Sequence, residues 1–170
     1  MLLNRKYIIA LALLALSGCG FSPLYAGPQG KQASAALETV QVQNIPDRPG
    51  QVLHQALQED FYRNGQPIQA LYLLSVNYSI NQTNEGIQED SSASRTRFDA
   101  VANWRLSPIG APSQTLTSGR ATARNALNII DQQYFATNLE TQTIDQQLAN
   151  EISAQITTQL AAWFRLHPGS

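Results

Sequence analysis

The residue best placed to do chemistry in this chain is its single cysteine, Cys19. It follows an apolar run at residues 7–16 and two small residues, Ser17 and Gly18. Since the sequence contains no second cysteine, no disulfide can form within the chain. A lone thiol beside a possible cleavage point would remain reactive unless it is modified. The position of Cys19 therefore predicts a site of covalent modification.

Residues 1–18 are typical of an export signal. Arg5 and Lys6 precede the apolar run, which is ten residues long, whereas a membrane-spanning helix needs about 20. A basic start, a short apolar stretch and small residues before the cleavage point are the three parts of such a signal. We therefore predict that residues 1–18 are removed.

The stretch Leu16-Ser17-Gly18-Cys19 resembles the lipobox of bacterial lipoproteins. The resemblance implies a thioether between Cys19 and diacylglycerol, cleavage before Cys19, and acylation of the new amino terminus. Three acyl chains would hold the protein durably in a membrane, because each buried CH₂ contributes about 0.8 kcal/mol. The alternative is a secreted protein whose cysteine lies near a conventional cleavage site by chance.

The composition limits the partners of the mature chain. Loss of Arg5 and Lys6 leaves nine of the eleven basic residues against twelve acidic ones. The absence of a basic excess argues against nucleic acid. Charged residues make up 14% of the chain, below the roughly 25% of average globular proteins. Uncharged polar side chains are cheaper to desolvate, so either compositional drift or a partner covering the surface explains them.

The elements that position these residues follow from hydrophobic periodicity. Residues 19–36 are predicted to be the lipidated amino terminus and a tether, residues 37–166 one α+β domain, and residues 167–170 a tail. Alternating and helical patterns predict a strand, a helix, three strands and a final helix, over residues 38–44, 49–63, 70–82, 95–106, 114–124 and 131–164. We expect an approximately four-stranded, mainly antiparallel sheet with both helices packed on one face.

Two of the predicted strands have one apolar and one polar face. Their apolar positions are Tyr72, Leu74, Val76, Tyr78, Ile80, Phe98, Ala100, Ala102, Trp104 and Leu106. The angle of Asp145 places it in the apolar stripe of the final helix. We interpret it as lying where that helix overhangs the sheet, and not as a buried catalytic carboxylate.

The heptapeptide Cys19-Gly20-Phe21-Ser22-Pro23-Leu24-Tyr25 resembles the start of mature LptE, the lipopolysaccharide-assembly lipoprotein, in its alphaproteobacterial branch. The order of elements is also similar to that family's fold. The resemblance implies an outer-membrane lipoprotein, anchored on the periplasmic side, that inserts into the lumen of the LptD β-barrel. That pair delivers lipopolysaccharide to the outer leaflet. The alternative is another periplasmic lipoprotein that acts as an envelope adaptor or a small ligand-binding module.

Five arginines form the only local concentration of positive charge. Arg95, Arg97 and Arg105 share one face of a predicted strand, and Arg120 and Arg124 join them if the next strand pairs in register. Guanidinium groups bind phosphates in a bidentate manner, so this face is a candidate contact for lipopolysaccharide or an acidic partner. The alternative is a solvated sheet face with Asp99 as the internal counter-ion.

Other chemistry is not indicated by the sequence. His54 and His167 are far apart in the chain, so no metal site of histidine and cysteine is predicted. Phosphate-binding, dinucleotide-binding and nucleophile-elbow motifs are also absent from the sequence. We therefore expect no cofactor and no enzymatic activity.

Overall fold

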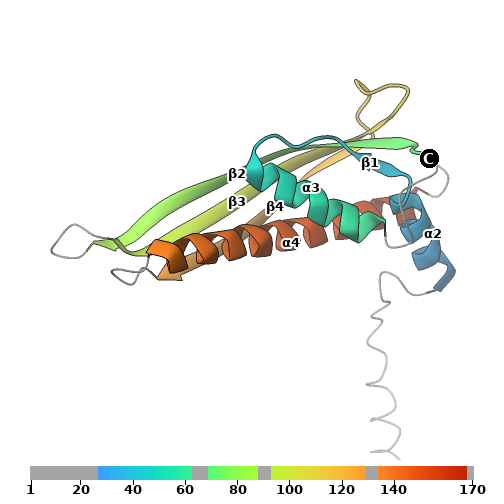
Figure 1. Cartoon of the computed structure of the whole chain (residues 1–170). Helices are drawn as coiled ribbons and strands as arrows, with labels where there is room; N and C mark the ends of the chain where they lie inside the picture. Colours follow the sequence, from blue (N-terminus) through green and yellow to red (C-terminus); the bar gives the residue numbers. More distant parts are fainter. Residues whose placement is uncertain (1–26, 63–68, 88–92, 129–133, 168–170) are drawn as a thin grey trace, which may run out of the picture.

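A computed structural model describes residues 27–62, 69–87, 93–128 and 134–167. The signal, Cys19 and the LptE-like heptapeptide all lie outside the described residues. Three helices lie on one face of a four-stranded sheet, and the other face of the sheet carries no helix of the described chain (Figure 1). The predicted α+β class is confirmed.

The sheet has the strand order β1-β2-β3-β4. Short β1 (Val40–Val42) runs parallel to β2 (Tyr72–Ile87). Strands β3 (Ala93–Pro108) and β4 (Thr117–Asn128) extend it by antiparallel pairing. The sheet is therefore mainly antiparallel, as predicted.

The central hairpin is longer than the sequence pattern indicated. Pairing between β2 and β3 continues to Ile87 and Ala93, although the predicted strands covered only residues 70–82 and 95–106. Beyond residue 82 the alternation of apolar and polar residues stops, because both faces of the hairpin are polar in this part. Without a buried face, periodicity gives no signal for a strand.

Helices α3 (Arg48–Phe61) and α4 (Tyr134–Leu166) cover the apolar face of the sheet (Figure 1). Pro49 lies in the first turn of α3, where its missing N–H costs no hydrogen bond. Gly50 follows it because a Cβ there would lie 2.8 Å from Cγ2 of Ile45. The predicted start of the last helix, at residue 131, lies outside the described residues.

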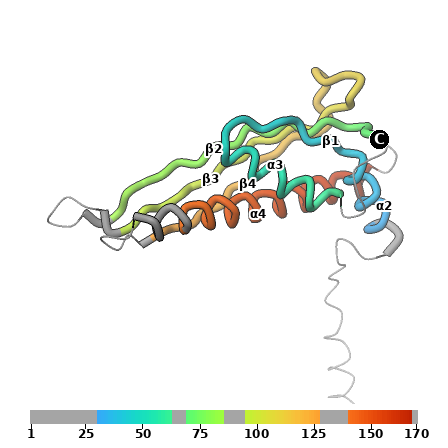
Figure 2. The backbone as a smooth tube through the Cα atoms, viewed as in Figure 1, coloured from blue at the N-terminus to red at the C-terminus, as the bar shows by residue number. Residues whose placement is uncertain are grey.

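Helix α2 (Gly27–Leu37) corrects the predicted tether, which is wrong over residues 27–36. Ala33 and Leu37 are buried, and the helix packs against the end of α4, as Figure 2 shows beside the red end of the chain. Glycine and proline at its start suggested irregular backbone. The apolar residues, spaced four apart, bury a stripe that outweighs that local preference.

The core lies between the sheet and α3 and α4. All the predicted inward positions of β3 are buried, from Phe98 to Leu106, and Tyr72 and Leu74 of β2 are buried too. Ser153 of α4 donates a 2.6 Å hydrogen bond to Asp60 of α3, which joins the two helices. Among the described residues, no helix is both long enough and apolar enough to cross a membrane.

Candidate functional site

The strand register brings the five arginines to the polar face of the sheet. Arg105 is opposite Ser118, Asn103 is opposite Arg120, and Asp99 is opposite Arg124. Because side chains two residues apart on a strand share a face, all five arginines emerge on the side away from α3 and α4. The predicted common face is confirmed, and the role of the arginines as contact residues stays a prediction.

Part of this arginine face is neutralised within the chain. Nε of Arg97 donates a 2.9 Å hydrogen bond to Oδ2 of Asp99. Arg124 forms a second ion pair with Asp99, and Glu85 forms another with Arg97. The bonds from Arg124 and Arg97 hold the pKa of Asp99 below its usual value. The alternative interpretation, in which Asp99 is the internal counter-ion, therefore applies to Arg97 and Arg124. Glu85 is a second acidic partner of Arg97, which the sequence did not indicate because the predicted strand ended at residue 82.

Arg105 and Arg120 lie next to each other on this polar face. They are diagonal neighbours across β3 and β4, since Asn103 lies opposite Arg120. Both are exposed, and no ion pair to either is found within the described residues. Diagonal positions in a sheet are within reach of long side chains, so the two guanidinium groups can converge on one anion.

The surroundings of Arg105 are polar and uncharged. An open hollow of about 580 Å³ runs beside it, lined by amides and hydroxyls that include Asn77 and Ser118. Gln43 accepts a 2.6 Å hydrogen bond from Ser75 at its rim. Arg95 lies ten residues away on the same strand, roughly 33 Å at about 3.3 Å per residue. The five arginines therefore form a stripe and not one compact site.

Asp145 does not overhang the sheet, so that interpretation is wrong. It lines a cavity together with Tyr78 of β2 and the start of α3. Burial raises the pKa of the Asp145 carboxyl, although the charge of Arg48 opposes the shift. Burial first, and then the negative charge of Asp145, raise the pKa of the Tyr78 hydroxyl.

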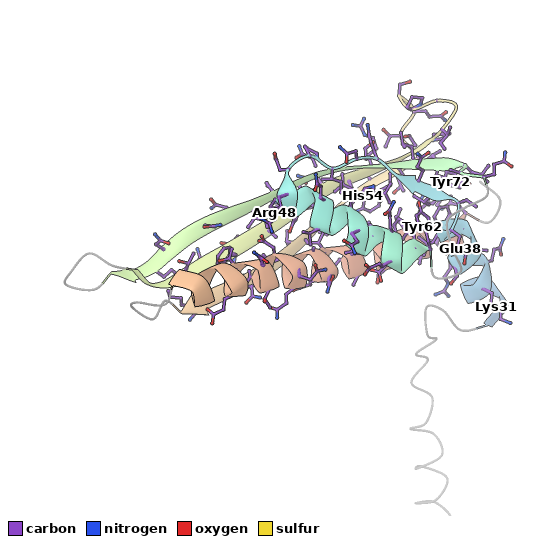
Figure 3. The ribbon with its side chains drawn as sticks, viewed as in Figure 1. Lys31, Glu38, Arg48, His54, Tyr62 and Tyr72 are labelled. Atoms are coloured by element: carbon purple, nitrogen blue, oxygen red, sulfur yellow. The ribbon has the colours of Figure 1, made fainter. Side chains whose placement is uncertain are left out.

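Each of the two histidines contacts another residue of the chain. Nε2 of His54 lies 3.4 Å from the carbonyl oxygen of Val42, at the side of α3 next to β1 (Figure 3). His167 stacks on Trp163 with a ring-centroid distance of 4.7 Å. Across the described part of the chain, no three His, Cys, Asp or Glu side chains are grouped to hold a metal ion.

Comparison with solved structures places this arrangement in a fold found in bacterial lipoproteins. A protein of Caulobacter crescentus described as a lipoprotein shares 21% identity over 78% of this chain and 96% of its own, with a TM-score of 0.63. Rare lipoprotein B of Shewanella oneidensis shares 8% identity over 73% and 92%, with a TM-score of 0.54. A minor lipoprotein of Acinetobacter baumannii shares 14% identity over 74% and 92%, with a TM-score of 0.58.

At these identities the similarity shows the fold alone. No family model matches the sequence, and no curated protein sequence is significantly similar to it.

Proposed function

We propose that this chain is an outer-membrane lipoprotein that plugs the LptD β-barrel and helps assemble it into the lipopolysaccharide translocon. Cys19 would carry the lipid anchor on the periplasmic side. The folded domain would occupy the lumen and assist delivery of lipopolysaccharide to the outer leaflet. The chain would perform no covalent chemistry itself.

The fold carries this proposal. The described domain shares its fold with bacterial lipoproteins that include rare lipoprotein B, and the order of its elements resembles that of the LptE family. The heptapeptide Cys19–Tyr25 independently resembles the start of mature LptE. Fold and heptapeptide come from different parts of the chain, so their agreement supports the proposal more than either does alone.

The shape and the surface chemistry of the domain also suit a plug. Helix α4 has 33 residues, about 50 Å at 1.5 Å per residue, and the sheet runs along it (Figure 1). The free face of β2 carries only small hydroxyl and amide side chains over its central part, namely Ser75, Asn77, Ser79, Asn81 and Thr83. Such groups can hydrogen-bond to a barrel wall at a lower desolvation cost than charged ones.

Affinity capture from gently solubilised outer membranes tests the proposed partner. The wild-type chain is compared with a Cys19→Ala form that is exported by a conventional cleaved signal. One large β-barrel, identified by mass, is expected with both forms, because the domain and not the lipid is the recognition element. Depletion of the chain is expected to reduce lipopolysaccharide on the cell surface. If neither form brings down a barrel, the plug function is wrong and the adaptor alternative is favoured.

Lipopolysaccharide contact is expected to depend on Arg105 and Arg120. The double variant Arg105→Gln/Arg120→Gln removes both guanidinium groups from the unneutralised part of the arginine face. Charge-assisted hydrogen bonds contribute roughly 1.5–3 kcal/mol each, so affinity for purified lipopolysaccharide should fall at least about tenfold. The affinity is measured by titration of the mature protein in detergent.

Two further variants serve as controls for this contact. Arg105→Lys/Arg120→Lys keeps the charge but loses bidentate geometry, so an intermediate affinity is expected. Lys31→Gln/Arg165→Gln removes the same charge from α2 and α4, away from the sheet face, and should bind as the wild type does. An equal loss of lipopolysaccharide affinity in this control would show that net charge alone explains the effect of the arginine variants. The specific contact of Arg105 and Arg120 would then be wrong.

A further inference from the structure

Among the residues that the structure describes, no strand pairs with the outer edge of β2 over most of its length. Strand β1 pairs only with Tyr72–Leu74, and the hydrogen bond from Gln43 to the carbonyl of Leu74 ends that ladder. No other strand among the described residues lies on this side of β2. Because backbone groups point to alternate sides of a strand, four further residues direct N–H and C=O outward as Leu74 does, namely Val76, Tyr78, Ile80 and Gln82.

The opposite edge of the sheet is covered by contrast. Gln155 of α4 donates from Nε2 to the carbonyl of Thr122 at 2.9 Å, and its Oε1 accepts from the N–H of Thr122 at 3.1 Å. Gln159 donates to the carbonyl of Arg120 at 3.2 Å. These side-chain amides replace the missing neighbour of β4. Within the described residues, α4 thus covers one edge of the sheet, whereas no strand covers the edge of β2 beyond Leu74.

The open edge also lacks the usual sequence protections against strand addition. Proteins commonly place lysine, proline or a bulge on an exposed edge. Residues 75–84 contain neither a proline nor a charged side chain, and their pairing with β3 is uninterrupted. Every outward N–H of this stretch is therefore present, and no charged side chain of residues 75–84 repels an incoming strand.

A cavity of about 320 Å³ lies beside this edge, on the helix-covered face of the sheet. It is lined by Tyr78, Ile80 and Gln82 of β2, by the first turn of α3, and by Asp47 and Asp145. Both carboxyl groups that line it are acidic, and no basic side chain is among the lining residues. Figure 3 shows Arg48 at the start of α3, and burial of Asp145 outweighs the effect of this cation on its pKa.

The Tyr78 hydroxyl is a further polar group at this cavity. It is buried and has no hydrogen-bond partner among the described residues. An unsatisfied buried polar group costs roughly 1–3 kcal/mol. A donor or acceptor that enters beside Asp145 would remove that cost, and a cation would at the same time neutralise the carboxylate.

We infer that an extended segment of a partner polypeptide adds to the outer edge of β2 as a fifth strand and places a lysine or arginine beside Asp145 and Tyr78. Its main chain would pair with the outward groups of Val76–Gln82, and its alternate side chains would enter the cavity. A second copy of this chain is a poorer occupant, because residues 75–84 supply no basic side chain. The inference does not rest on the identity of the barrel.

The test uses the mature full chain in detergent and the synthetic peptide Val-Thr-Val-Thr-Lys-Thr-Val-Thr-Val, whose lysine shares a face with its valines. Backbone amide exchange is followed by NMR. The N–H groups of Val76, Tyr78, Ile80 and Gln82 should exchange at least about tenfold more slowly with the peptide bound. The intervening amides, already bonded to β3, should show little change.

Two matched changes separate edge pairing from nonspecific binding. A peptide with glutamate in place of lysine should bind at least about tenfold more weakly, and Asp145→Asn should remove most of this preference. Gln82→Pro deletes one outward N–H and should weaken the binding of both peptides, while unchanged exchange of the amides of β3 and β4 shows that the fold persists.

Three results would overturn the inference: protection without alternation along β2, equal affinity for both peptides, or no protection at millimolar peptide. Protection that depends only on protein concentration would assign the edge to a second copy instead. None of these outcomes bears on barrel capture, so the two proposals can fail separately.

Discussion

Gly119→Val is expected to lower the free energy of unfolding by about 2–4 kcal/mol. A Cβ at Gly119 would lie 2.6 Å from Cζ2 of Trp104 and 2.8 Å from Oε1 of Gln159. Trp104 is 4% exposed, and its Nε1 donates a 3.1 Å hydrogen bond to that same oxygen. The larger side chain must therefore displace a buried ring and break the bond that satisfies its indole N–H.

Gly110→Val is the matched control for this prediction. Apart from its chain neighbours, no atom of the described residues lies within 4 Å of the position that its Cβ would take, so the change in stability should stay within about 0.5 kcal/mol. Both variants and the wild type are unfolded in urea and followed by tryptophan fluorescence and circular dichroism. Equal stability of Gly119→Val and the wild type would show that Trp104 and Gln159 move aside easily, and that this contact does not fix α4 to β4.

The apolar faces of the strands were predictable because one period governs them. Alternation over residues 70–82 and 95–106 marked the inward positions from Tyr72 and Phe98 onward, and the structure buries or half-buries them as expected. The same alternation fixed which arginines share a face. Register between neighbouring strands was needed only to add Arg120 and Arg124.

Other features depend on contacts that leave no local pattern. Helix α2 is stabilised by packing against α4, whereas its own sequence begins with glycine and proline. The glutamines that cover the edge of β4 are spaced four apart, at Gln155 and Gln159, but an amide facing solvent and an amide facing a strand edge look alike in sequence. Their role requires the placement of α4 against the sheet.

The candidate sites were likewise predictable from the sequence only in part. Sequence reasoning found the arginine face but could not separate the neutralised pair, Arg97 and Arg124, from Arg105 and Arg120. That division depends on Glu85, which lies in the unpredicted extension of β2. The open edge of β2 was also invisible, because an unpaired strand and a paired one carry the same alternation.

Cys19→Ala is expected to abolish acylation of the chain completely. The thioether requires a sulfur nucleophile, and this chain has only one cysteine. Growth with a labelled fatty acid should label the wild-type protein and leave the variant unlabelled. Intact-mass measurement should show the lipid on a chain that begins at Cys19. Label retained in the variant would place the lipid elsewhere and contradict the lipobox interpretation.

The same residue separates membrane anchoring from partner recognition. Purified mature protein with Cys19 acylated should float with protein-free phospholipid vesicles, because even two acyl chains give stable anchoring. The Cys19→Ala form, exported with a conventional signal, should not float with the vesicles, because it lacks the acyl chains. If this unlipidated form still captures the barrel, the lipid acts as a tether and the domain carries specificity. Flotation of the unlipidated form would instead assign membrane affinity to the domain itself.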